Sequence, residues 1–323
     1  LLNGQKANAG EVSVDEIGVK ALDEKTLEVK LESPTPYFLQ LTAFPCYFPV
    51  RKDIVEADPE GWALNPETYI SNGPFTMTEW THNDVLRLVK NENYYDAENV
   101  KIEEIEYVMI VEGSTAFSAF QSGEIDYTEN VPADQIVQLQ EAQDANFNIF
   151  PYIGTYFYCF NMNAELMKDV KVREALSLAI DREAIVTNVT KGGQIPANGF
   201  VSEGIATSTG ESFRTLAGDY GVPVKADVEK AKALLAEAGY PDGAGFPELE
   251  LLYNTNEGHK AIAEAVQEMW KQNLGINVTL RNEEWKVFQE SRKNGNYTVA
   301  RHGWIGDYAD PMTFLEMWTT GAG

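Results

Sequence analysis

The chain has 323 residues, 44% of them hydrophobic, a length that predicts two domains with cores large enough to fold without disulfides. Its 50 acidic and 25 basic side chains give a net charge of −25, which argues against binding to nucleic acid or to anionic membranes. No apolar stretch is long enough to span a membrane, and the first residues lack the basic start and apolar core of a signal peptide.

Alternation of apolar and polar residues predicts a series of strands in the first half of the chain. They are residues 17–21, 27–31, 75–80, 85–89, 102–110 and 125–127. Residues 82–84 favour a tight turn, so the third and fourth strands are predicted to form a hairpin. Before the last strand, Ser114 is predicted to cap a short helix that ends at Gly123.

The segment 152–160 is β-branched and aromatic, which predicts a strand that crosses between two domains. Helix and strand patterns then alternate, and Asp181 and Asp227 are predicted to cap two of the helices. The predicted helices are 172–180, 181–189, 227–238 and 262–270, and the predicted strands are 249–253, 276–280 and 297–300. A strand–helix–strand order implies a parallel pair with a right-handed crossover, so the second half is predicted to be an α/β unit.

Common catalytic and cofactor motifs are absent from the sequence, which has no phosphate-binding glycine loop, nucleophile elbow or HExxH motif. Cys46 and Cys159 stand far apart and three scattered histidines add no metal-ligand spacing, so we expect no cofactor and no metal. Acidic pairs such as Glu283-Glu284 could serve hydrolysis, which needs two carboxylates across a cleft. With 50 acidic residues such pairs arise by chance, and we interpret them as solvated surface.

One polar segment, residues 301–311, follows the last predicted strand. It brings Arg301, His302, Trp304 and Asp307 together around two glycines at a strand end, where α/β folds place ligands. The alternative is an ordinary polar loop in which Trp304 fills the core. The residues alone leave both interpretations open.

The sequence Trp304-Ile305-Gly306-Asp307-Tyr308 resembles the ligand-contact turn of bacterial oligopeptide-binding proteins, the solute receptors of peptide ABC transporters. Other stretches similar to the same family follow in the same order along nearly the whole chain. They are residues 41–45, 72–75, 93–96, 122–126, 154–158, 172–177, 180–182, 252–255, 284–286 and 291–296.

The resemblance implies an α/β fold of the two-lobed, periplasmic-binding-protein-like type (type II, extracellular solute-binding family 5). The chain would cover the middle and later part of such a receptor and be truncated at both ends. Residues 1–155 would form a partial, strand-rich first lobe, and residues 156–323 a second α/β lobe truncated at its C-terminus. We expect unpaired strand edges in the first lobe, and a location outside the cytoplasm, in the periplasm or as a cell-surface lipoprotein whose anchor region is not in this chain.

The same resemblance assigns roles to the ends of a bound peptide. Asp307 matches the family's aspartate that pairs with the peptide N-terminus. Arg301 and His259 match positions that meet the C-terminal carboxylate of short peptides. The backbone of Gly303, Trp304 and Ile305 would bind the extended ligand as an added strand.

Further positions concern the side chains and length of the ligand. Trp285 and Arg292 match residues that line pockets for ligand side chains. Asn188 stands where enteric relatives place a lysine suited to longer peptides, which leaves the preferred length open. Cys159 matches a cysteine that some relatives pair with one in the ligand turn, but here that position is Ile305, so we expect two free thiols.

The function implied is a non-catalytic receptor that captures short peptides between two lobes and delivers them to the permease subunits of an ABC importer. The alternative from a different class is a hydrolase, a peptidase or glycosidase, on a two-lobed scaffold. Dipeptides, murein peptides and signalling peptides all remain open as ligands.

Overall fold

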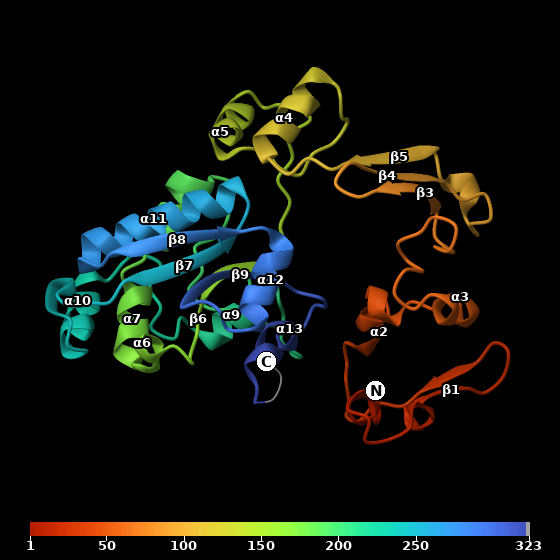
Figure 1. Ribbon diagram of the computed structural model, residues 1–323, viewed down its shortest axis with the longest axis horizontal. Helices are drawn as coiled ribbons and strands as arrows, with labels where there is room; N and C mark the ends of the chain where they lie inside the picture. The colour runs from red at the N-terminus through yellow and green to blue at the C-terminus, as the bar shows by residue number, and fades with distance from the viewer. Residues whose placement is uncertain (321–323) are drawn as a thin grey trace.

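The computed structural model describes residues 1–320, whose strands form three separate sheets (Figure 1). The first is a hairpin of β1 (Val19–Ala21) and β2 (Leu27–Val29). The second is an antiparallel sheet of β3 (Phe75–Thr81), β4 (Val85–Lys90) and β5 (Glu104–Val108). The third has the order β6-β9-β7-β8 and belongs to the second half of the chain.

The first part of the chain is thinly packed. None of residues 1–76 is buried, and apolar side chains such as Leu39, which is 79% exposed, face water. Within the described residues, β3 and β5 each have one strand edge without a neighbour. The helices of this part are α1 (Gly4–Asn8), α2 (Phe38–Leu41), α3 (Lys52–Ala57), α4 (Gly113–Ser122) and α5 (Ala133–Glu141).

Two predictions for this part are wrong. Residues 125–127 form no strand: no strand runs beside them in the described chain, and Tyr127 is exposed. Ser114 lies inside α4 rather than at its N-cap, which is Glu112. The predicted end of this helix is confirmed, because Gly123 adopts the left-handed conformation (φ 78°) that favours glycine.

The third sheet carries the main core of the protein. Its strands are β6 (Gly154–Phe160), β7 (Leu249–Asn254), β8 (Val278–Glu283) and β9 (Val299–Ile305). β7 runs parallel to β8 and β9, whereas β6 runs antiparallel to β9. The parallel pair β7–β8 predicted from the sequence is confirmed, and both β7 and β8 contact the helix between them.

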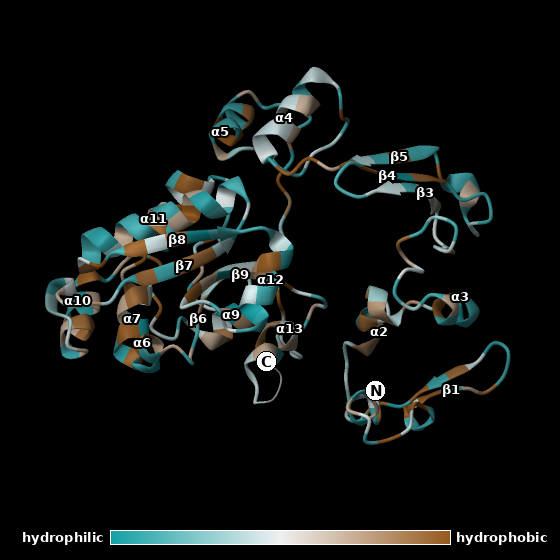
Figure 2. Cartoon of the chain, viewed as in Figure 1, coloured by the Kyte–Doolittle hydropathy of each residue, from teal (hydrophilic) through white to brown (hydrophobic). Residues whose placement is uncertain are grey.

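Helices cover this sheet on both faces (Figures 1 and 2). On one face α7 (Val170–Leu178), α10 (Val228–Glu237) and α11 (Glu257–Leu274) enclose a core with Leu251 and Val299. On the other face α12 (Trp285–Lys293) places Phe288 against Leu252 and Ala300. Because β7 is covered on both faces, it reads as a nearly continuous apolar run.

Local sequence signals set the helix boundaries. The carboxylates of Asp181 and Asp227 accept hydrogen bonds from the N–H groups of Ala184 and Lys230, at 2.7 and 3.1 Å, which confirms both predicted caps. The helix begun at Asp181 (α8, Arg182–Ala184) continues as a π-helical turn, Ile185–Thr190. The remaining short helices are α6 (Glu165–Lys168), α9 (Phe213–Ala217), α13 (Met312–Leu315) and the 3₁₀ turns at Val14–Glu16, Pro45–Tyr47, Ala97–Asn99, Pro241–Gly243 and Glu316–Trp318.

None of the helices in residues 1–320 is both long and apolar enough to cross a bilayer. The largest departure from the predicted elements lies in β9, which does not end at residue 300. It continues to Ile305 because it pairs with β6 along its whole length, so the predicted loop begins only at Gly306.

Trp270 is the largest fully buried side chain, and its indole N–H donates to the Leu176 carbonyl at 2.8 Å. We expect Trp270→Phe to lower the free energy of unfolding by about 2 kcal/mol, because it leaves a void and an unpaired buried carbonyl. Trp285, 49% exposed, offers the matched control, and Trp285→Phe should stay within about 0.5 kcal/mol of the unchanged protein in urea titrations. Equal losses in the two variants would contradict this account of the core.

Candidate functional site

The candidate site is built on β9 where it separates from β7. The two strands are paired only at Leu251–Val299 and Leu252–Ala300, whereas β6 accompanies β9 as far as Ile305. From Arg301 onward, one edge of β9 therefore has no strand beside it in the described chain. Such an edge offers backbone donors and acceptors to an extended peptide.

Arg301 lies at the start of this open edge. Its guanidinium carbon is 5.0 Å from the centre of the Tyr156 ring, and one Nη donates to Asn254 Oδ1 at 3.2 Å. Its Nε and the hydroxyl of Tyr158 are buried and have no hydrogen-bond partner in residues 1–320. Buried donors without partners are costly, so this cluster is suited to accept an anionic group such as a carboxylate.

Burial keeps the neighbours of Arg301 uncharged. Burial raises the pKa of Tyr156 to about 12, although the Arg301 charge acts in the opposite direction. Burial, reinforced by Arg301, lowers the pKa of His259 to about 4, and its ring centre lies 5.6 Å from that of Tyr156. At neutral pH the cluster therefore holds one positive charge, on Arg301, surrounded by neutral groups that can form hydrogen bonds.

The middle of the edge is formed by His302, Gly303 and Trp304. The His302 ring stacks on Phe157 at 4.7 Å between centres, and its Nδ1 accepts from the Gly303 N–H at 2.7 Å. Trp304 packs against the small core of Val201, Ile205 and Phe314, and its indole N–H approaches Thr313 Oγ1 at 3.4 Å. Trp304 thus fills a core, as in the alternative interpretation, and also lines the neighbouring hollow.

Asp307 lies beyond the end of β9, in a hollow of about 330 Å³. Its backbone N–H donates to Thr313 Oγ1 at 2.9 Å, and its carboxylate has no hydrogen-bond partner among the described residues. Partial burial raises its pKa, and it forms no ion pair within the described residues. The hollow is lined by Trp304, Asp307, Tyr308, Thr313, Glu316 and Met317, a set without a cation.

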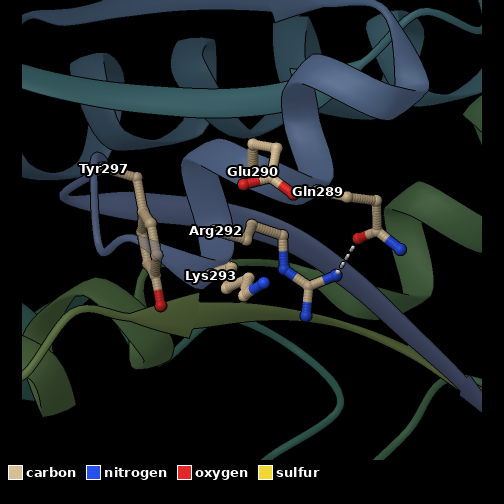
Figure 3. Close-up of a pocket in the computed structure, with 5 residues that line it drawn as sticks. All are labelled: Gln289, Glu290, Arg292, Lys293 and Tyr297. Atoms are coloured by element: carbon tan, nitrogen blue, oxygen red, sulfur yellow. Dashed lines mark hydrogen bonds between the residues drawn. The ribbon is translucent and has the colours of Figure 1, made fainter.

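Helix α12 forms a second hollow, of about 350 Å³, on the face of the sheet opposite to Arg301 (Figure 3). Figure 3 shows Arg292 beside Gln289, whose Oε1 accepts from its guanidinium at 3.3 Å. The same guanidinium lies 5.5 Å from the centre of the Phe288 ring. Arg292 has no ion pair to a carboxylate in residues 1–320, and burial lowers its pKa.

The structure brings most of the predicted site residues together. Arg301, Gly303, Trp304, Ile305 and Asp307 follow one another along β9 and its turn, and His259 joins them through Tyr156. The two predicted site residues on α12 lie nearby: Arg292 lines the second hollow, and Trp285 stacks on Phe288.

Asn188 is not brought into this group. It lies in the π-helical turn with an exposed side chain, and it has no hydrogen-bond partner in the described part of the chain.

Three residues of the site were missed by sequence reasoning: Tyr156, Tyr158 and Asn254. The two tyrosines alternate along β6, so they share the face of the sheet that carries Arg301. The sequence did carry a signal for them, because their hydroxyls are polar groups in an otherwise apolar strand. Its meaning depends on pairing with β9, which lies far away in the sequence.

An open strand edge between a cationic cluster and a carboxylate is suited to an extended ligand with opposite charges at its ends. The family model of the bacterial extracellular solute-binding proteins, family 5, middle region, matches residues 2–323. The chain belongs to this family, whose members are binding proteins rather than enzymes.

The relatives describe what this chain is similar to. The oligopeptide-binding protein OppA of Bacillus subtilis is 39% identical over 325 residues, which cover 98% of this chain and 58% of that protein. The crystal structure of an oligopeptide-binding protein from Borrelia burgdorferi has a TM-score of 0.90 at 37% identity and covers 99% of this chain and 62% of that one. The chain thus spans less than two thirds of the length of these relatives.

A third relative, the murein tripeptide-binding protein MppA of Escherichia coli, shows how the parts of such a chain can be arranged. One of its structures matches with a TM-score of 0.87, and its unliganded open form with 0.56, both at 36% identity. Each match covers 99% of this chain, and they cover 62% and 61% of those chains. The parts of the present structure are therefore arranged unlike those of the open form.

The pKa values of the buried histidines make stability depend on pH. Burial, with Arg292 and Arg301 nearby, lowers the pKa of His302 to about 4, as it does for His259, from an ordinary value of 6.5. The unfolded chain therefore binds more protons than the folded chain between about pH 6.5 and 4, so stability should fall as the pH falls through this window. Because both rings are only partly buried, we expect roughly 1 kcal/mol from each.

Urea titrations at about pH 7 and pH 4.5 measure this difference. His259→Gln should lose less stability between the two values than the unchanged protein, whereas exposed His82→Gln should lose the same amount. Identical losses in all three proteins would contradict a neutral, buried His259.

Both cysteines are free in the structure, Cys46 exposed and Cys159 partly buried. Burial raises the pKa of the Cys159 thiol to about 11, so at neutral pH it should remain protonated and unreactive. We expect iodoacetamide to alkylate Cys46 in the folded protein and Cys159 only after denaturation, as measured by mass spectrometry. A denatured, unreduced chain with no reactive thiols would instead reveal a disulfide.

Proposed function

We propose that the full-length protein is the substrate-binding receptor of an ABC importer, which captures short peptides between two lobes and delivers them to the membrane permease. Residues 1–155 contribute part of the first lobe, and residues 156–323 contribute most of the second. The receptor works outside the cytoplasm, in the periplasm or as a lipoprotein on the cell surface. Family membership and the name of the B. subtilis relative support this proposal.

The observation that carries the proposal is the open edge of β9, with Arg301 near one end and Asp307 beyond the other. The four residue steps from Arg301 to Ile305 span roughly 13 Å in extended conformation, the length of an extended peptide of about four residues. Gly306 then begins the turn that carries Asp307. The ligand lies antiparallel to β9, with its N-terminus at Asp307.

Every peptide carries the groups that this site contacts. The ammonium pairs with Asp307, the backbone bonds to the β9 edge, and the carboxylate meets Arg301, His259 and the unpaired Tyr158 hydroxyl. Successive ligand side chains point to opposite faces of the sheet, so some enter the α12 hollow lined by Arg292. Affinity therefore depends little on the identity of the side chains.

We expect Asp307→Asn in the full-length protein to weaken binding of a free tripeptide by about 10- to 100-fold. The ammonium then faces a neutral amide, and a hydrogen bond to a charged group contributes about 1.5–3 kcal/mol. N-acetylated tripeptide should bind the two proteins equally weakly in calorimetry. The control Asp126→Asn changes an exposed carboxylate without hydrogen-bond partners in the described residues and should leave affinity unchanged. Equal binding of free and acetylated peptides by the unchanged protein would contradict the role of Asp307.

We expect Arg301→Ala to weaken short peptides with a free carboxylate and to have a milder effect on longer ones, whose carboxylate extends past the cluster. Amidation of a tripeptide should reproduce most of the loss in the unchanged protein, because it removes the same charge pair.

Incubation of a peptide mixture with the protein, followed by mass spectrometry, tests the hydrolase alternative. Cleavage products would favour a peptidase.

A further inference from the structure

Among the described residues, segments before β6 and segments after it are joined by side-chain hydrogen bonds or stacked rings at two places. At the first, the Glu257 carboxylate accepts from the Ser114 hydroxyl at 2.7 Å and from the Ser114 N–H at 3.0 Å. We call this pair the Glu257 clasp.

At the second, the Tyr308 ring stacks on Tyr37, with ring centres 4.2 Å apart and planes 9° from parallel. Beside it, the Ala309 N–H donates to Gln40 Oε1 at 2.8 Å. We call this group the Tyr308 clasp.

The Glu257 clasp supplies what α4 lacks. The N-cap of this ten-residue helix, Glu112, makes no side-chain cap hydrogen bond. Glu257, from a remote part of the chain, fills this place, and it also lies in the first turn of α11. One carboxylate thus lies at the N-termini of two helices, whose dipoles both favour a negative charge.

Each clasp also lies next to one end of the proposed ligand site. Glu257 is two residues from His259 in the first turn of α11, and the Asn256 side chain fixes that turn by accepting from the His259 N–H at 3.1 Å. Tyr308 directly follows Asp307. A ligand that orders the two ends of the site therefore orders the two clasps as well.

Resting on the proposed function, we propose that Glu257 and Tyr308 are positioning residues that hold the two lobes closed and couple closure to the two ends of the peptide. The arrangement agrees with the weaker match to the unliganded open form of MppA, in which the parts are placed differently. Neither residue needs to touch the ligand.

The test measures lobe separation directly in the full-length protein. Spin labels are placed at Lys52→Cys and Lys286→Cys, two exposed positions in the first and second halves of the chain, after Cys46 and Cys159 are changed to Ser. Pulsed electron resonance then gives the distance distribution with and without a tripeptide.

We expect Glu257→Ala to lower the ratio of closed to open molecules about tenfold, because a charge-assisted pair of hydrogen bonds is lost. Tyr308→Ala should act in the same direction, whereas Tyr308→Phe, which keeps the stacked ring, should restore closure. Glu264→Ala on the same helix, where the carboxylate pairs only with exposed Lys260 among the described residues, is the matched control and should leave the ratio unchanged.

Peptide affinity provides the second readout. Glu257→Ala should weaken the binding of free, acetylated and amidated tripeptides by the same factor, since closure is linked to the binding of all of them. Variants of Asp307 and Arg301 should instead affect the three peptides differently. A cooperative thermal unfolding transition would show that the variant is folded.

The proposed role of the clasps would be overturned if the spin-label distances in Glu257→Ala and Tyr308→Ala matched those of the unchanged protein, both without ligand and at saturation. If no peptide binds the unchanged protein, the proposed function fails. The ligand-free distances still decide the clasps in that case.

Discussion

The antiparallel pairing of β6 with β9 is the interaction on which the rest of the site depends. It holds β9 extended for five residues past the point where β7 leaves, and this difference in length produces the open edge. It also sets Tyr158 opposite Arg301, and Tyr156 opposite Gly303, on the same face. A β9 that ended with β7 would be a fully paired strand with a flexible loop, and Arg301 would be free to turn into water.

Holding Arg301 in this position is energetically unfavourable without a ligand. The guanidinium is surrounded by aromatic rings and an amide, its Nε has no partner among the described residues, and two histidines nearby remain neutral. The protein as a whole carries a charge of −25, yet no carboxylate pairs with Arg301 or Arg292 in the described chain. Unpaired, preorganised donors in a partly dry site bind an anion more strongly than donors that must first leave an internal partner.

The sequence predicted features that depend on neighbouring residues. The caps at Asp181 and Asp227, the hairpin of β3 and β4 and the apolar strand β7 all follow from patterns within a few positions. The sequence did not predict features that are determined by a segment remote in the chain. β9 extends because β6 lies beside it, and Ser114 sits within α4 because Glu257 supplies the cap from another part of the chain. For the site, the residues of segment 301–311 pointed to Arg301 and Asp307, and the resemblance added their roles and His259. Tyr158 and Asn254 became visible only through pairing of the strands.

If the protein recognises peptides through their ends and backbone, as proposed, closure must be controlled by groups other than ligand side chains. A receptor that contacts only features common to all peptides gains nearly the same interaction from each of them, so side chains cannot report that the site is full. The two ends of the peptide can report that the site is full, because each would lie beside a contact between the two halves of the chain. These contacts are Glu257, near His259, and Tyr308, next to Asp307. Under the proposed function, closure would respond to the presence of a peptide rather than to its sequence. The ligand side chains would lie in the hollows, where they would adjust affinity without determining whether the lobes close.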